Sequence, residues 1–176
     1  MMSSSPTYAV AVAAAKDFLG TFRTLILASA DVRGTPQASY APFVRADEDT
    51  FYIYVSRLAR HTANLAGSSQ VSVLFIEDEE TSEELFARRR LTLYCAVQAI
   101  DRESSLWHQK LDLFEKKFGE VATLIRPLED FVLFALAPKR ATYVEGFAKA
   151  YTFEGALLQM LLGCSDAVLG AGAGSG

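Results

Sequence analysis

The sequence predicts a mainly β protein, folded as a small closed barrel with flanking helices. Roughly seven or eight short segments rich in β-branched and aromatic residues follow one another, mostly joined by short turns. Helical patterns occur only at the start, the middle and the end of the chain. A chain of 176 residues is most simply one domain that buries its own core. Successive strands with few helices between them favour a barrel.

The first predicted hairpin follows an N-terminal helix. An alanine-rich stretch over residues 8–19, with apolar residues at helical spacing, predicts this helix. Strand character begins at residues 21–30 and returns over 35–44. Gly34 lies in the turn between them, where glycine tolerates a positive φ angle.

The middle of the chain alternates strands with short helices. An acidic run over 77–84 contains Thr81 and Ser82, and either residue could cap a short helix behind it. The elements expected here are strands over 51–55, 70–77 and 90–100, and short helices over 58–66 and 85–87.

The second half of the chain begins with an amphipathic helix over 101–118, which Gly119 ends. Three strands over 131–137, 141–144 and 148–153 and a short helix over 155–162 complete the prediction. The expected domain organisation is an N-terminal helix over 1–20, a barrel domain over 21–153, and a C-terminal helix with a flexible glycine-rich tail over 154–176.

Charge and cysteine content exclude several classes of function. The net charge of −4 and the lack of a basic tail argue against nucleic-acid binding. The cations are local, at Arg57, Arg60 and residues 88–90, which favours one small anionic ligand. Cys95 and Cys164 have no metal-type spacing, so we expect no metal site.

The same composition bears on location and assembly. No basic region precedes the apolar residues 9–15, and these are too few to span a bilayer, so a cytoplasmic protein without membrane contact is expected. At 51% hydrophobic residues, the chain has more apolar surface than one small domain hides, which indicates a buried subunit interface.

The most informative stretch follows the predicted strand over 51–55. Ser56 ends that strand, and Arg57, Arg60, His61 and Asn64 lie in the short helix behind it. Free amides at a helix N-terminus attract an anion, and adjacent cations add charge-assisted contacts. A solvated basic helix face is the alternative interpretation of the same residues.

Several segments together resemble the pyridoxamine-phosphate-oxidase-like split barrels. Residues 24–31, 34–36 and 39–43 are similar to the opening hairpin of that family. Further segments resemble the bacterial haem-utilisation subgroup, of the Hut/Hug type, within it. These segments are residues 59–65, 71–73, 76–79, 86–92, 130–134 and 146–151.

The resemblance implies a homodimeric split β-barrel of the FMN-binding type, with its sites at the subunit interface. The FMN phosphate would lie near the helix corner, the flavin ring along the second arm of the hairpin, and an arginine of the 88–90 run would add a contact. The expected cofactor-binding residues are Ser39, Tyr40, Ala41, Pro42, Ser56, Arg57, Arg60, His61, Asn64 and Arg90.

In the haem-utilisation subgroup, the same barrel binds haem, and an aspartate matching Asp130 supports a proximal histidine from a C-terminal segment. This chain has only His61 and His108, so His61 and Asp130 are the haem-related candidates. The sequence thus predicts an FMN-dependent oxidoreductase with unassigned catalytic residues. Haem binding for storage or oxidative degradation is the alternative, and a barrel that acts only through its dimer surface is a third.

Overall fold

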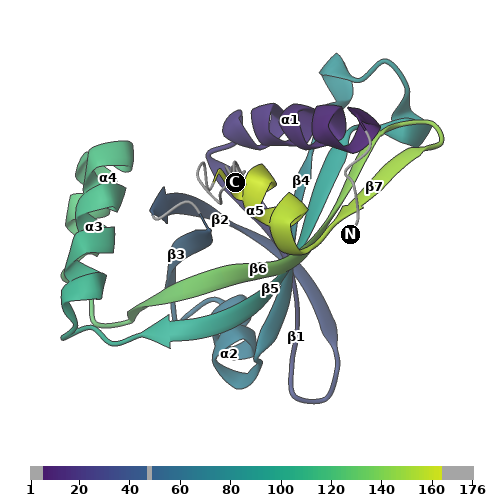
Figure 1. Cartoon of the computed structure of the whole chain (residues 1–176). Helices are drawn as coiled ribbons and strands as arrows, with labels where there is room; N and C mark the ends of the chain where they lie inside the picture. The colour runs from purple at the N-terminus through teal and green to yellow at the C-terminus, as the bar shows by residue number, and fades with distance from the viewer. Residues whose placement is uncertain (1–5, 47–48, 164–176) are drawn as a thin grey trace, which may run out of the picture.

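The computed structural model describes residues 6–46 and 49–163, and its strands form one antiparallel sheet (Figure 1). The strands are β1 (Thr24–Ala30), β2 (Pro36–Ala46), β3 (Thr50–Ser56), β4 (Gln70–Ile76), β5 (Arg90–Ile100), β6 (Phe131–Gly146) and β7 (Lys149–Phe153). The helices are α1 (Pro6–Gly20), α2 (Arg60–Gly67), α3 (Ser105–Phe118), α4 (Glu120–Ile125) and α5 (Gly155–Leu162). Two 3-10 turns, η1 (Glu79–Thr81) and η2 (Leu85–Ala87), lie between β4 and β5.

The sheet closes on itself. Its strand order is β3-β2-β1-β4-β5-β6-β7, and β3 also pairs with β6, from Phe51↔Leu136 to Ser56↔Phe131. Strands β1 to β6 therefore form a barrel, and β7 extends the sheet beyond β6. The predicted mainly β barrel with flanking helices is confirmed.

Alternating apolar residues fill the interior of the barrel. In β1, Leu25 and Leu27 are buried while their neighbours along the strand are exposed, as expected for a strand with one face in the core. Three rings, Phe43, Phe51 and Phe75, lie within 6 Å of one another, centroid to centroid, in this core. Residues of α1 and α5 belong to the same core, so both helices cover it.

A second apolar core lies outside the barrel, between the α3–α4 pair and β3. Tyr52 and Tyr54 point out of the barrel and pack there with Trp107, Leu111 and Phe114 of α3. Strand β3 is therefore buried on both faces. Figure 1 shows α3 and α4 standing beside the barrel.

The barrel is split between β2 and β3. Their ladder stops at Phe43↔Ile53, although β2 continues back to Pro36 and β3 continues to Ser56. Helix α2 lies at this end of the barrel (Figure 1). Its Leu65 enters the core and is only 2% exposed.

Three local predictions were wrong in detail. Residues 131–137 and 141–144 belong to the single strand β6, because β6 accommodates the interruption as a bulge at Lys139, opposite the step from Tyr94 to Cys95 of β5. Helix α4 was not predicted. Glu84, rather than Thr81 or Ser82, caps η2 by accepting a hydrogen bond from the Phe86 N–H.

The predictions that remain concern the C-terminal tail, the domain division and membrane contact. The glycine-rich tail over 170–176 and Cys164 lie outside the described residues. The proposed division at residues 20 and 153 stays a prediction. Among the helices described, none is long and apolar enough to cross a membrane.

Truncating Leu65 to alanine should lower the free energy of unfolding by about 2–5 kcal/mol, because the cavity lies where α2 closes the barrel. Leu58→Ala is the matched control, because Leu58 is 90% exposed. This variant should change the free energy of unfolding by less than about 0.5 kcal/mol. Urea unfolding followed by circular dichroism measures both. Equal effects of the two variants would show that α2 does not close the core.

Candidate functional site

A carboxylate of the chain itself occupies the predicted anion corner. The Ser56 hydroxyl donates to Asp130 Oδ2 at 2.7 Å, and the Arg57 N–H donates to the Asp130 carbonyl oxygen at 2.7 Å. Ser56 Oγ also accepts from the Leu58 N–H at 3.1 Å. The Ser56 hydroxyl therefore already donates one hydrogen bond and accepts another within the chain.

The start of α2 differs from the prediction over 58–66. The helix begins at Arg60, and Ala59 precedes it without any side-chain cap. Thr62 donates its hydroxyl to the Ser56 carbonyl oxygen at 2.5 Å, which ties the first turn of the helix to the end of β3. Ser56 therefore organises the strand-to-helix turn rather than capping α2.

Arg57 and Arg60 are the cations that this corner exposes. No ion pair joins either guanidinium to a carboxylate in the part of the chain that the structure describes. Arg60 lies close enough to Asp31 to contribute to lowering the pKa of that carboxyl, although the main cause is the backbone hydrogen bond from Thr35. The pair is available to bind an anionic group.

His61 carries a buried nitrogen without a partner. Its Nε2 atom is sealed from solvent and makes no hydrogen bond to the described residues. Burial lowers the pKa of His61 below its usual 6.5, because the charged imidazolium is the form that loses hydration. The imidazole is therefore neutral at neutral pH.

Asn64 has a structural role. Its side-chain amide donates to Ser29 Oγ at 3.0 Å and to Gln37 Oε1 at 3.1 Å, joining α2 to β1 and β2. With one buried and one half-buried partner, the amide group is committed to holding α2 across the end of the barrel.

The predicted residues of β2 divide between its two faces. Ala41 is buried in the core, and Ser39 shares its inward face with a buried hydroxyl oxygen. Tyr40, at 68% exposed, and Pro42 point outward. Only Tyr40 and Pro42 can therefore contact a ligand from outside the barrel.

Arg90 does not join this corner within one copy of the chain. It begins β5 and pairs with Val144, whereas Ile100, at the other end of β5, pairs with Leu133 near the end of β3. Ten residues of extended strand separate these two levels by about 30 Å. Arg90 is thus distant from Ser56 along β5, although the register across β4 and β1 places it level with Pro42 of β2.

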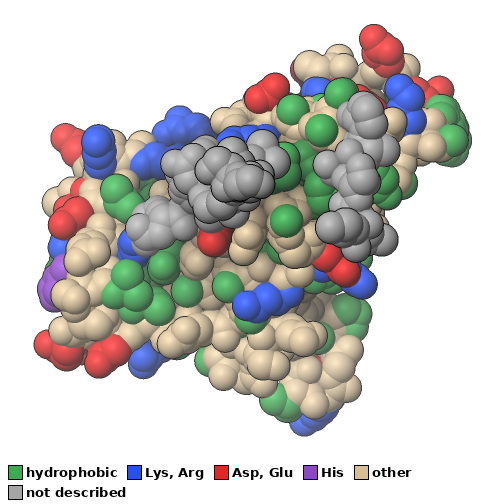
Figure 2. Space-filling view, viewed as in Figure 1, with side chains coloured by type: hydrophobic (Ala, Val, Ile, Leu, Met, Phe, Trp, Pro, Cys, Tyr) green, Lys and Arg blue, Asp and Glu red, His purple; other side chains and the backbone are tan. Residues whose placement is uncertain are grey.

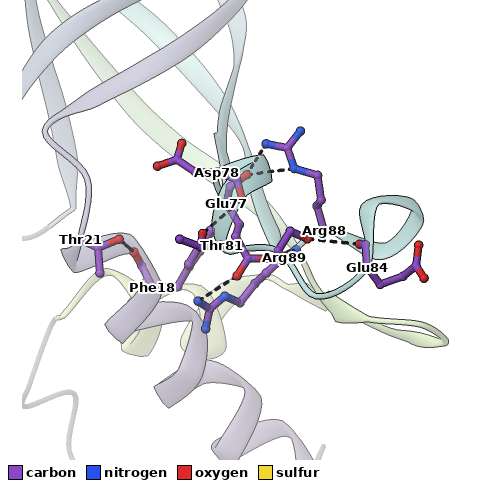
Figure 3. Close-up of polar contacts among 9 residues, drawn as sticks. Phe18, Thr21, Glu77, Asp78, Thr81, Glu84, Arg88 and Arg89 are labelled. Atoms are coloured by element: carbon purple, nitrogen blue, oxygen red, sulfur yellow. Dashed lines mark hydrogen bonds and ion pairs between the residues drawn. The ribbon is translucent and has the colours of Figure 1, made fainter.

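A hollow of about 770 Å³ lies at the Arg90 end, between the end of α1, the start of β1 and the 77–89 segment. Figure 3 shows Arg88 and Arg89 meeting Glu77 there. Arg88 donates to the Glu77 carbonyl oxygen, and Arg89 pairs with the Glu77 carboxylate at 3.5 Å and lies over the Phe18 ring at 4.7 Å. These arginines are paired already, so an anion entering this hollow competes with Glu77.

The outer face of β1 and β4 is apolar and open. All outward residues of β1 are exposed, among them Ile26 and Ala28. Leu74 and Tyr94 continue this face on the neighbouring strands. A solvated face of an antiparallel sheet is ordinarily polar, so this face has the character of an interface.

The described residues contain no group of three or more His, Cys, Asp or Glu side chains that could hold a metal ion. Cys95 is buried, and burial raises the pKa of its thiol to about 12. This thiol is therefore protonated and unreactive at neutral pH.

Comparison with known proteins assigns the fold to a family. The model of the Pyridoxamine 5'-phosphate oxidase family matches residues 11–145. The chain belongs to this family. The split between β2 and β3 and the strand order above are therefore features of a pyridoxamine-phosphate-oxidase-type barrel.

The relatives within the family include haem proteins. Heme oxygenase HutZ from Vibrio cholerae is 40% identical over 140 residues, which are 80% of this chain and 79% of HutZ. The crystal structure of HutZ, described as a heme storage protein, has a TM-score of 0.66 at 41% identity and covers 70% of this chain and 87% of HutZ. Campylobacter jejuni ChuZ has a TM-score of 0.77 at 29% identity, over 87% of this chain and 63% of ChuZ.

Sequence reasoning missed the contact between Asp130 and Ser56. The two residues are 74 positions apart, and only the pairing of β3 with β6 brings them together. It also missed the pairing of Arg88 and Arg89 with Glu77. The acidic run over 77–84, directly before the arginines, was the available signal for that pairing.

The environment of His61 predicts its titration. The pKa of His61 should lie below 6.5 in the folded protein, so the unfolded chain binds its proton first as pH falls, and stability declines below pH 6.5. Proton NMR of the two histidines, assigned with His61→Asn and His108→Asn, measures this pKa. A value at or above 6.5 for His61 would contradict the buried placement.

Proposed function

We propose that this chain binds haem at the seam between two copies of the barrel. The observation that carries the proposal is the 40% identity to Heme oxygenase HutZ across 80% of the chain, together with the shared barrel. The FMN-dependent oxidoreductase predicted from the sequence rests on the family match alone.

Electrostatics at the end of β3 favour haem over FMN. A phosphate placed on the Ser56 hydroxyl would lie against the Asp130 carboxylate, which already accepts that hydrogen bond at 2.7 Å. Two anions in contact repel, most strongly when one is a phosphate dianion. The propionates of haem are single charges on flexible arms, and they reach Arg57 and Arg60 on the exposed side instead.

The chain offers a less suitable axial ligand for the haem iron than it offers cations for the propionates. His61 has the neutral imidazole form that ligates iron, but the chain seals its Nε2 from solvent. His108 is exposed on α3 and packs edge-on against Trp107 at 5.0 Å. Bound haem would supply redox-active iron.

The chain's own residues have defined tasks in this proposal. Arg57 and Arg60 bind the propionates, and Tyr40 with Pro42 offers an outward apolar surface on the opposite side of the split. The Ser56–Asp130 pair keeps the turn before α2 in place, so that both arginines are held at the seam.

A homodimer completes the site. The open apolar face of β1 and β4 is the surface that a second copy would cover. In an isologous pair whose two-fold axis runs across the barrels, Arg90 of the second copy would lie beside the Ser56 end of the first.

Hemin titration tests the proposal. The protein should give a saturable Soret shift, and the double variant Arg57→Ala/Arg60→Ala should bind hemin at least about tenfold more weakly, because two charge-assisted contacts are lost. Lys149→Ala, an exposed cation elsewhere, is the control. A flavin spectrum with FMN and no response to hemin would favour the flavin function instead.

Sedimentation tests the dimer. The chain of 19.2 kDa should sediment at twice that mass, and Ala28→Glu should yield a folded monomer, because Ala28 is exposed in one copy and covered in two. Ala13→Glu, an exposed site on α1, should leave the dimer intact. A monomeric parent protein would remove the seam on which the site is proposed.

A further inference from the structure

A separate pocket lies where the C-terminal ends of α1 and α3 meet the C-terminal part of β2. We call it the Phe43 pocket, and it encloses about 510 Å³. It is lined by Leu19, Gly20, Phe22, Phe43, Val44, Arg45, Leu113, Lys116 and Lys117. None of these residues belongs to the proposed haem site, and no carboxylate is among them.

Cations from separate elements converge on Phe43. Lys117 Nζ donates to the Phe43 carbonyl oxygen at 2.8 Å and lies 4.4 Å from the centre of its ring. The Phe43 N–H donates to the Arg23 carbonyl oxygen at 3.3 Å, which places Arg23 alongside. The Arg23 guanidinium donates to the Lys117 carbonyl oxygen at 3.4 Å and lies 5.5 Å from the Phe118 ring.

The pocket holds an excess of positive charge. The pKa of Lys117 lies below its usual value, first because the ammonium group is partly buried and then because Arg23 and Arg45 repel it. Lys116 adds a further, exposed cation at the rim. Figure 2 shows Lys and Arg side chains gathered between the α3–α4 pair and α1.

The rest of the lining is apolar. Leu19 and Phe22 come from the end of α1 and the turn after it, and Leu113 comes from α3. A pocket with an apolar floor and a few convergent polar groups of one sign fits a ligand with an apolar body and an opposite charge.

Helix ends alone do not explain this arrangement. The C-terminal carbonyl groups of α1 and α3 attract cations, and this accounts for the hydrogen bond from Arg23 to Lys117. Lys117 Nζ, in contrast, donates to the carbonyl oxygen of Phe43 in β2, inside the pocket. This hydrogen bond uses one of the three N–H donors of the ammonium group.

We infer that the Phe43 pocket is a second binding site, for a small organic carboxylate with an apolar chain or ring. The carboxylate would lie between Lys116 and Lys117, with Arg23 beside Lys117 at the edge of the pocket, and the apolar part would lie against Leu19, Phe22 and Leu113. This site is distinct from the haem seam, and its test does not depend on haem.

Calorimetric titration with sodium octanoate tests the inference. Octanoate should bind saturably. Inorganic phosphate, which has only the charge, and 1-octanol, which has only the apolar chain, should each bind at least about tenfold more weakly, because each lacks one of the two contacts. Raising the salt concentration should weaken octanoate binding.

Two variants locate the binding. A Cβ atom at Gly20 would meet no atom within 4 Å, so Gly20→Phe adds bulk at the wall of the pocket without a clash of its Cβ atom. Lys116→Glu reverses a charge at the rim. Each should weaken octanoate binding at least about tenfold, because the first removes the space and the second adds a repelling charge. Arg33→Glu, in the exposed β1–β2 turn, should leave it unchanged.

Circular dichroism and urea midpoints verify that each variant folds. Three results would overturn the inference. These are no saturable binding of octanoate, equal binding of 1-octanol, or unchanged octanoate affinity in both Gly20→Phe and Lys116→Glu. Hemin binding should be unaffected by Gly20→Phe, so the two proposed sites fail or succeed separately.

Discussion

The pairing of β3 with β6 closes the sheet and at the same time opens the split beside β2. β3 follows β6 along its whole length, from Phe51 to Ser56, so the twist of β6 governs its direction. β2 stays paired with β3 only as far as Phe43. Beyond that point the two strands separate, and α2 closes the end of the barrel through Leu65 and Asn64. The proposed cofactor residues lie along this separation.

The same pairing bears on the anion that we propose for this corner. It brings Asp130 to Ser56, so the serine hydroxyl that would otherwise bind a phosphate already donates to a carboxylate. The free positive charge remains on Arg57 and Arg60, whose side chains are exposed to solvent. A ligand with carboxylates on flexible arms matches that arrangement better than a phosphate held at the helix start.

Local pattern was enough to predict most elements of the fold. The turn at Gly34, with a φ angle of +84°, and the strand character of β1 are local, and both were predicted. The continuous β6 was missed, because Pro138 in the sequence indicates a turn, while the pairing with β5 that tolerates it through a register shift is not local. Likewise, spacing identified Ser56 and Arg57, but not the Asp130 carboxylate, and it grouped Arg90 with Ser56, although about 30 Å of β5 separates their levels.

A subunit-mixing measurement tests the shared site most directly. One copy carries Arg90→Ala and the other Arg57→Ala/Arg60→Ala, and each homodimer alone should bind hemin weakly. If one copy supplies Arg57 and Arg60 and the other supplies Arg90, the mixed dimer should regain one tight hemin site per dimer by Soret titration. A mixed dimer that binds no better than either homodimer would contradict a site built across the two subunits.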